Sequence, residues 1–455
     1  MELKQTIRDY LAWQDACPSV FHVGEAISAK LAQAGFTRLL IQDQNWHLEA
    51  GGRYYVRHPD EKAFVAFVVG AKSPQQKGFS LLAAHTDSPV LRLKMNPVKE
   101  GPGFVRLATQ LHGGLIQRSW LDRPLILAGK VYWTSQSSQE VVWDLDHHLP
   151  LLHQSLVRSA KPIAVIPDLA IHLDRSKNES GAINPEEMLA AVIGTSLSES
   201  LTPHRFDTML SQFFGFSPEQ EICGFDLTLA PYHPHMLVGH DESLILGPRH
   251  DDLAMSFAGL CAITSLPGDF VPPRTAALLL VDAEETGSKT VSGAESTFVR
   301  DILEKICRQH PAAEPLEDIS QAFALSFLVS ADMAHGLHPA HPEKHDTNHK
   351  PLLNRGLVIK ENASDRYATS GYTAAIFRKL CEAAKVPVQH FVNRQDLACG
   401  STIGPILAAN LNCQTVDVGT AMWGMHSSGE TMGAYDLFYA AQVFQTFFTA
   451  GARSF

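Results

Sequence analysis

Phe79-Ser80-Leu81-Leu82-Ala83-Ala84 runs directly into His85-Thr86-Asp87, and this junction decides how the chain is interpreted. An uninterrupted run of apolar and small residues is typical of a strand that is buried on both faces. Side chains two residues apart on a strand point the same way, so His85 and Asp87 are expected on one side. A histidine with a carboxylate to orient it is a common form of metal ligand.

The same design recurs twice further along the chain. Leu278-Leu279-Leu280-Val281 leads through Asp282-Ala283 into Glu284-Glu285, and Phe327-Leu328-Val329-Ser330-Ala331 leads into Asp332. Sites in open α/β sheets form beyond the carboxyl ends of the strands. We therefore expect His85, Glu284, Glu285 and Asp332 to meet at one edge of a sheet.

The order of helical and strand-like segments predicts an α/β fold with a mixed, largely parallel sheet flanked by helices. Apolar residues recur at helical spacing from Val23 to Ala34. Further helices are expected at 252–266, 371–384 and 435–448, and further strands at 63–69, 276–281, 323–330 and 413–418.

A middle region, residues 97–235, differs from both flanks. Short strand-like runs such as Leu125–Ala128 and Lys130–Trp133 are separated by polar turns, and one helix is expected at about 185–198. The predicted division is therefore a catalytic domain in two parts, 1–96 and 236–455, with a mainly β domain inserted between them.

Composition excludes several classes of protein. The 455 residues have a formal net charge of −11, which argues against nucleic acid or an anionic membrane as the main partner. No apolar run approaches the roughly 18 to 20 residues that cross a bilayer, and the segment Met1–Asp9 lacks a signal-peptide core, so a cytoplasmic location is expected. Seven scattered cysteines without a Cys-x-x-Cys pair favour reduced thiols.

Five side chains are candidate metal ligands: His85, Asp251, Glu285, Asp332 and His426. Two imidazoles and three carboxylates suit zinc, with manganese or cobalt as alternatives, whereas calcium prefers oxygen ligands alone. Such a set can hold two metal ions, with one carboxylate bridging them. Glu284, next to Glu285, is the candidate group for moving protons.

Each of these motifs also has a structural interpretation when it is taken alone. Asp251-Asp252 can cap the helix that follows, and Asp332 can be a turn residue at a strand's end. His426 can be a hydrogen-bonded core histidine, and Glu284-Glu285 can be a solvated pair. Their combination at strand ends is what favours a metal site.

Several segments resemble the signature segments of the aspartyl aminopeptidase family of dinuclear zinc peptidases, in the family's order from about residue 20 to the end of the chain. They are Ala84–Pro89, Asp282–Ser288, Ser330–His335, Gly400–Pro405 and Met425–Ser427. The resemblance implies that Asp251 bridges two metal ions, with His85, Glu285, Asp332 and His426 completing their shells. It implies that Glu284 is the general base and that Asp87 orients His85. It further implies a dimerisation role for the inserted domain and a tetrahedral homododecamer built from dimers.

The chain departs from the family's pattern at two places. The usual Arg-Leu-Asp-Asn is Arg249-His250-Asp251-Asp252 here, which adds titratable neighbours to Asp251. The usual Met-His-Ser-x-Arg-Glu is Met425-His426-Ser427-Ser428-Gly429-Glu430, which keeps His426 but puts an ion pair in doubt.

The resemblance also suggests two substrate-binding residues. Lys360 matches a lysine near the substrate's first side chain, where a cation suits an acidic residue; a solvated strand lysine is the alternative. His172 matches a histidine that reaches a neighbouring subunit's active site.

We therefore predict a metalloaminopeptidase that hydrolyses an N-terminal residue, Asp or Glu, from peptides with a water activated by two metal ions. The alternatives are an aminopeptidase for neutral residues, a related dinuclear amidohydrolase, and a non-catalytic assembly protein.

Overall fold

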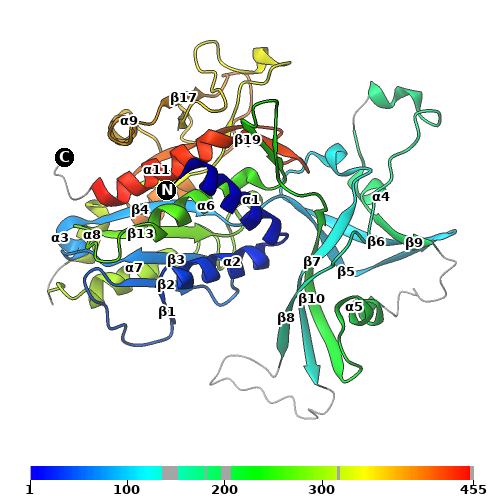
Figure 1. The fold of residues 1–455 in the computed structure, drawn as a ribbon, viewed down its shortest axis with the longest axis horizontal. Coiled ribbons are helices and arrows are strands. Elements are labelled where there is room, and N and C mark those ends of the chain that lie inside the picture. The colour runs from blue at the N-terminus through cyan, green and yellow to red at the C-terminus, as the bar shows by residue number, and fades with distance from the viewer. Residues whose placement is uncertain (1, 136–151, 180–181, 196–205, 315–317, 451–455) are drawn as a thin grey trace.

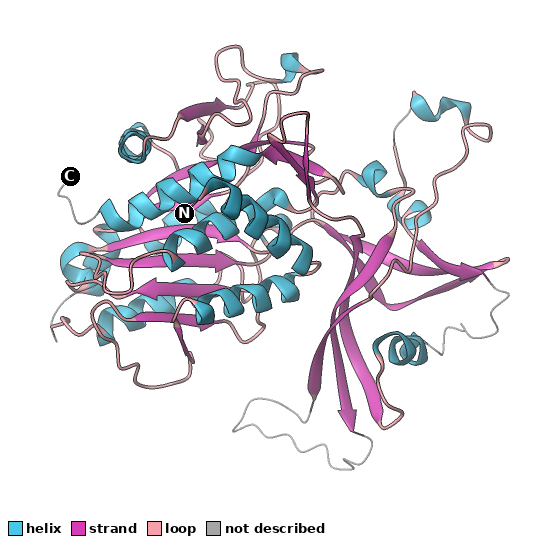
Figure 2. Cartoon of the chain, viewed as in Figure 1, coloured by secondary structure: helices cyan, strands magenta, loops and turns pink. Residues whose placement is uncertain are grey.

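The computed structural model describes residues 2–135, 152–179, 182–195, 206–314 and 318–450, which form two separate β-sheets. Figure 1 shows helices packed against the larger sheet, and Figure 2 shows the smaller sheet beside it. The larger sheet has 13 strands in the order β1-β2-β3-β13-β4-β14-β18-β19-β12-β11, with β15, β16 and β17 off this path. The smaller sheet has six, in the order β8-β7-β10-β5-β6-β9.

The elements have the following bounds. The strands of the larger sheet are β1 (Thr37–Leu39), β2 (Arg53–Arg57), β3 (Phe64–Val68), β4 (Phe79–His85), β11 (Met236–Val238), β12 (Leu244–Gly247), β13 (Thr275–Val281), β14 (Phe327–Ala331), β15 (Ala334–His335), β16 (Leu357–Glu361), β17 (Val388–Val392), β18 (Gln414–Trp423) and β19 (Glu430–Gly433). Those of the smaller sheet are β5 (Val90–Gly101), β6 (Phe104–His112), β7 (Leu125–Ser135), β8 (His153–Arg158), β9 (Ala191–Thr195) and β10 (Gln220–Pro231). The α-helices are α1 (Leu3–Ala16), α2 (Val20–Gln33), α3 (Pro74–Lys77), α4 (Pro185–Met188), α5 (Phe206–Phe214), α6 (His250–Thr264), α7 (Phe298–Gln309), α8 (Ile319–Ala324), α9 (Gly371–Ala384), α10 (Ile403–Leu411) and α11 (Ala434–Ala450). The 3₁₀ turns of the described residues are η1 (Gln117–Trp120), η2 (Arg175–Asn178), η4 (Glu284–Thr286) and η5 (Pro342–Lys344).

The centre of the larger sheet is parallel, as the sequence predicts. β4 pairs in parallel with β13 on one side and β14 on the other, and β14 pairs in parallel with β18. All seven residues of β4 are buried. Leu82 and Ala84 belong to one hydrophobic cluster, while Leu81 and Ala83 belong to a second cluster across the sheet. A strand with cores on both faces needs a continuous apolar sequence, which explains the run 79–84.

Helices cover both faces of this sheet. The first cluster includes residues of α1, α2, α6, α9 and α11, and Figure 1 shows α1, α2, α6 and α11 lying over one face. The second cluster includes residues of α7, α8 and α10. Within the described ranges, no helix is both long enough and apolar enough to span a membrane.

The smaller sheet has its own hydrophobic core, in which Leu91, Leu107, Leu127 and Leu229 are buried together with residues of α5. Its pairings are antiparallel. In the chain it lies between β4 and β11, as an inserted β-rich unit does. The predicted boundary at 96/97 falls within β5 and the one at 235/236 falls just before β11, and the division into these domains stays a prediction.

Two element predictions are wrong. The helix expected at 185–198 is helical only in α4, because Ala191–Thr195 pairs with β6 as β9 instead; Val192, Ile193 and Thr195 are β-branched and Gly194 disfavours a helix. The strand expected at 323–330 begins only at Phe327, because Phe323 and Ala324 are the last residues of α8. Residues 196–198 lie outside the described ranges.

Candidate metal centre

The carboxyl ends of the parallel strands bring the five predicted ligands together. His85 is the last residue of β4, Asp332 follows β14, and Glu285 lies in η4 just beyond β13. Asp251 lies in the first, irregular turn of α6, and His426 lies between β18 and β19. Their ligand atoms form overlapping groups whose members lie within 4.8 Å of one another, and these groups also contain Asp252 and Glu284.

Asp251 stands between the two imidazoles. Its Oδ2 lies 3.2 Å from His426 Nε2, and its Oδ1 lies 3.5 Å from His85 Nε2. His426 Nε2 is also 3.3 Å from Glu285 Oε1. Glu284 Oε2 lies farther out, 4.0 Å from His85 Nε2. The two neighbouring glutamates therefore approach different imidazoles.

The outer nitrogen of each imidazole has a partner that fixes the direction of the ring. His85 Nδ1 lies 3.1 Å from the Asp87 carbonyl oxygen and 3.2 Å from Asp87 Oδ1. His426 Nδ1 lies 3.0 Å from the carbonyl oxygen of Gly114, just beyond β6 of the smaller sheet. Both Nε2 atoms consequently face the carboxylates, and a partner of this kind is typical of a histidine that binds metal.

Asp87 also organises the two glutamates. The backbone N–H groups of Glu284 and Glu285 donate to its carboxylate at 3.0 and 3.3 Å. His112, at the end of β6, lies with Nε2 3.0 Å from Asp87 Oδ2. The pKa of Asp87 is lowered because hydrogen bonds from His112 and His85 outweigh the effect of burial. Sequence reasoning missed His112, since no motif marks it.

Glu430 ties two ligand-bearing segments together. Its Oε2 accepts from the N–H of Asp251 at 3.1 Å, and its Oε1 accepts from the N–H of His426 at 2.6 Å. Burial raises the pKa of Glu430 to about 8. Because both partners are N–H donors, the carboxylate is the form that satisfies them. The sequence places Glu430 in the His426 motif, but only the fold reveals its contact with Asp251.

The backbone is strained around the site. Arg249, Ala283 and His426 have left-handed φ values of 62°, 62° and 69°. Such a conformation is unfavourable for residues other than glycine and persists only where the surrounding structure holds it. Each of the three lies within two residues of, or is itself, a predicted ligand.

The carboxylates crowd together in a buried space that favours a cation. Burial, reinforced by neighbouring carboxylates, raises the pKa of Glu284 to about 8, that of Glu285 to about 7 and that of Asp332 to about 6. Burial lowers the pKa of His426, but Asp251 and Glu285 outweigh it and raise the value to about 11. These four side chains therefore bind protons tightly in the absence of metal, and a bound metal ion would displace those protons.

The donor set fits a divalent metal ion. Asp251 Oδ1 and Glu285 Oε1 are buried and, in the described part of the chain, accept no hydrogen bond. Metal coordination would satisfy such oxygens, and the mixture of imidazole and carboxylate suits zinc and similar ions.

The departures from the family's pattern have different consequences. His250 turns away from the cluster, with Nδ1 2.7 Å from the hydroxyl of Tyr10 on α1. Burial holds the pKa of His250 well below its usual value, so the ring is neutral. Asp252, in contrast, lies inside the cluster and accepts from the N–H of His85 at 3.0 Å. Gly429 donates to Ser427 Oγ at 3.1 Å and adds no charge.

Lys360 lies on β16, and its side chain contacts Asp332. Its side chain is 2% exposed, and Nζ lies 3.0 Å from the Asp332 carbonyl, 3.2 Å from the Met333 carbonyl and 3.4 Å from Asp332 Oδ2. An ammonium has three N–H donors, so these acceptors account for all of them. His172 is exposed in the β-rich unit and belongs to none of the candidate metal-binding groups of the described residues.

Comparisons with known proteins agree with this geometry. A model of the family described as "Aminopeptidase I zinc metalloprotease (M18)" matches residues 13–448. "Probable M18 family aminopeptidase 2" from Pseudomonas aeruginosa (strain UCBPP-PA14) is 38% identical over 99% of this chain and 98% of that protein. The protein of the same name from Stutzerimonas stutzeri (strain A1501) is also 38% identical, with the same coverage.

Solved structures share the fold. The chain matches one in "Cryo-EM structure of the Ape4 and Nbr1 complex" with a TM-score of 0.89 and 34% identity, over 98% of this chain and 86% of that one. An M18 aminopeptidase from Thermotoga maritima matches with a TM-score of 0.82 and 23% identity, over 98% and 96%. The "S. cerevesiae mApe1 dodecamer" matches with a TM-score of 0.81 and 24% identity, over the same shares.

Proposed function

Because the chain belongs to the M18 family of zinc metalloproteases and is a metal-dependent aminopeptidase, we propose that it removes N-terminal Asp or Glu residues from peptides with two metal ions. The single observation that carries the two-metal proposal is the position of Asp251. It belongs to one group with His85 and Asp332 and to another with Glu285 and His426. Asp251 is therefore the bridging ligand in our proposal, and each group holds one ion.

Bound divalent ions supply Lewis-acid polarisation of the scissile carbonyl and acidify the attacking water. The protein's part in proton transfer falls to Glu284. Its side chain is 17% exposed, compared with 4% for that of Glu285, so Glu284 is the more accessible of the pair. In our proposal Glu284 takes a proton from the water as the water attacks the carbonyl carbon, and then gives it to the leaving amine nitrogen as the C–N bond breaks.

Lys360 is the proposed basis of acidic specificity. Its ammonium is buried beside Asp332, and its three donors already have acceptors. A substrate carboxylate would therefore be attracted by the Lys360 charge across a short, poorly solvated distance, or it would replace one of the present acceptors of the ammonium. An aminopeptidase for neutral residues and a related amidohydrolase are the remaining alternatives. Steady-state rates on Asp-, Glu-, Leu- and acetyl-Asp-p-nitroanilide separate all three.

The β-rich unit is proposed to join subunits in a cytoplasmic homododecamer. Exposed Leu169, Ile171 and Leu173 flank His172, an arrangement that suits contact with another subunit. The dodecameric mApe1 relative supports this assembly. Mass photometry of the purified protein should show a twelve-chain particle; a monomer that retains full activity would contradict both the assembly and a role for His172 across the subunit boundary.

Substitution of Glu284 by glutamine tests the proposed mechanism. Gln has the same shape but cannot take up the proton, so Glu284→Gln should lower kcat by about a hundredfold or more. Zinc content, measured by mass spectrometry of the metal, should stay at the wild-type level. Glu382→Gln, an exposed glutamate on α9, is the matched control and should keep wild-type kcat. Wild-type turnover by Glu284→Gln would remove this residue from the proposed role.

A further inference from the structure

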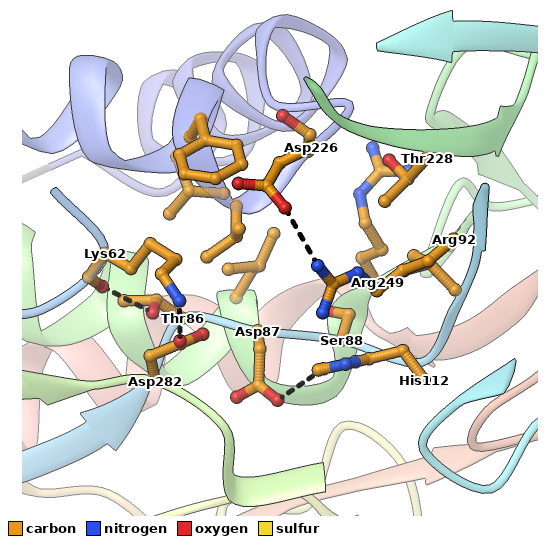
Figure 3. Close-up of a pocket in the computed structure, with 16 residues that line it drawn as sticks. Lys62, Thr86, Asp87, Ser88, Arg92, His112, Asp226, Thr228, Arg249 and Asp282 are labelled. Atoms are coloured by element: carbon orange, nitrogen blue, oxygen red, sulfur yellow. Dashed lines mark hydrogen bonds and ion pairs between the residues drawn. The ribbon is translucent and has the colours of Figure 1, made fainter. Parts of the chain in front are cut away.

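A cavity that is lined by Thr86, Asp87 and Ser88 lies next to the metal centre. It has a volume of about 90 Å³ and is bounded by residues of α2, β5, β10 and the start of α6. None of the five predicted metal ligands lines it, but Asp87 and His112 do. Figure 3 shows Lys62 and Asp282 on one side of this cavity and Arg92, Arg249 and His112 on the other. It is thus separate from the centre while sharing a wall with it.

Most charges that line the cavity are already neutralised. The ion pairs are Lys62 Nζ with Asp282 Oδ2 at 2.7 Å, Arg92 Nη2 with Asp226 Oδ1 at 3.0 Å, and His112 Nε2 with Asp87 Oδ2 at 3.0 Å. Each carboxylate on the wall therefore has a basic partner.

Arg249 is the exception. Arg249 is 8% exposed, and its Nη2 donates to the Gln14 carbonyl oxygen at 3.3 Å. Nε and Nη1 are buried and have no hydrogen-bond partner among the residues that the structure describes. These two nitrogens carry three N–H donors. Glu430 and Asp15 attract the Arg249 charge from a distance, but neither forms an ion pair with it among the described residues. A buried guanidinium with unpaired donors is unfavourable, so this position calls for an acceptor that bears negative charge.

The rest of the wall determines what kind of anion fits. Val20, Phe21, Val23, Val90 and Leu253 form an apolar surface. Because one cation lacks a partner while three carboxylates line the wall, a monoanion fits better than a phosphate dianion, which would meet like charges. We propose that this cavity binds a small organic monocarboxylate, with its carboxylate on Arg249 and a short aliphatic body against the apolar wall.

Isothermal titration of the metal-loaded full-length protein tests the proposal, with isovalerate as the probe. We expect saturable binding of one isovalerate per chain. The neutral isostere 3-methylbutan-1-ol should bind at least about tenfold more weakly than isovalerate, because a charge-assisted hydrogen bond is lost. Inorganic phosphate should also bind at least about tenfold more weakly, because its second charge adds repulsion from the carboxylates of the wall. The same titration after chelation of the metal should give the same affinity.

Two variants locate the bound probe. Arg249→Met should weaken isovalerate binding about tenfold to a hundredfold. Val20→Trp keeps Arg249 but fills the cavity, so it should weaken binding similarly even if Arg249→Met fails to fold. Arg378→Met, on the exposed face of α9, is the matched control and should bind as the wild type does.

Four results would overturn the proposal: no saturable binding to the wild type, equal binding of the alcohol, unchanged binding by folded Val20→Trp, or binding that disappears with the metal. The last would place the carboxylate on the metal centre. Failure of Glu284→Gln to lose activity would leave this cavity unaffected, so the two proposals can fail separately.

Discussion

Replacing Glu430 by glutamine should loosen the metal centre without removing a ligand. The carboxylate accepts one N–H from Asp251 and one from His426, at 3.1 and 2.6 Å. A glutamine oxygen can keep one of these bonds, but its NH₂ group then faces the other donor. Losing one charge-assisted bond in a buried site costs about 2 kcal/mol, which corresponds to about a thirtyfold loss of metal affinity.

Competition between the protein and a chromogenic chelator measures this affinity directly. Glu382→Gln, on the exposed face of α9, controls for the loss of a negative charge and should bind metal as the wild type does. Circular dichroism should show that Glu430→Gln is folded, since the substitution keeps the shape of the side chain. If folded Glu430→Gln binds metal as tightly as the wild type, the two hydrogen bonds by which Glu430 joins Asp251 to His426 have no role in shaping the site.

Three further outcomes are expected. Asp87→Asn should lower metal affinity about tenfold to a hundredfold, because an amide cannot accept from both glutamate N–H groups and the two histidines at once; unchanged affinity in the chelator assay would contradict this. Lys360→Met should destabilise the fold by about 3 kcal/mol and lower the Asp-to-Leu ratio of kcat/KM, since Asp332 loses its buried partner; Lys379→Met, on the surface, should change neither. Burial lowers the pKa of His22 from 6.5 to about 4, so the unfolded state binds more protons than the folded state between these pH values. The free energy of unfolding should therefore fall, by up to about 3 kcal/mol, as the pH drops through this window. Denaturant titration of the metal-free proteins should show a steeper loss of stability in the wild type than in His22→Gln.

The larger sheet and most of the candidate site follow from local patterns. A short run of apolar and small residues such as 79–84 is typical of a strand with cores on both faces, and parallel strands place their carboxyl ends at one edge. His85, Glu285 and Asp332 were therefore predictable as neighbours. The helix predicted at 185–198 failed because pairing with β6 outweighs the local pattern in Ala191–Thr195.

Contacts between distant segments were not predictable. Glu430 lies 179 residues from Asp251. His112 is the last residue of β6 in the other sheet, and Gly114 follows that strand. His250 immediately precedes the predicted ligand Asp251 in the sequence, yet its ring turns toward Tyr10 because α1 packs there. Periodicity reports which side of an element is buried, but it carries no information about which far residue lies against it.

The loop that carries His426 rests on the segment that leaves β6. Besides the Gly114 carbonyl, the N–H of Ile116 donates to the His426 carbonyl at 3.0 Å, and the N–H of Ser428 donates to Ser119 Oγ at 2.9 Å. The β-rich insertion is therefore not a detachable module. A shortened enzyme made by splicing residue 89 to residue 232 would keep every predicted ligand and still misplace one of them, so miniaturisation of this scaffold must retain the stretch from 112 to 119.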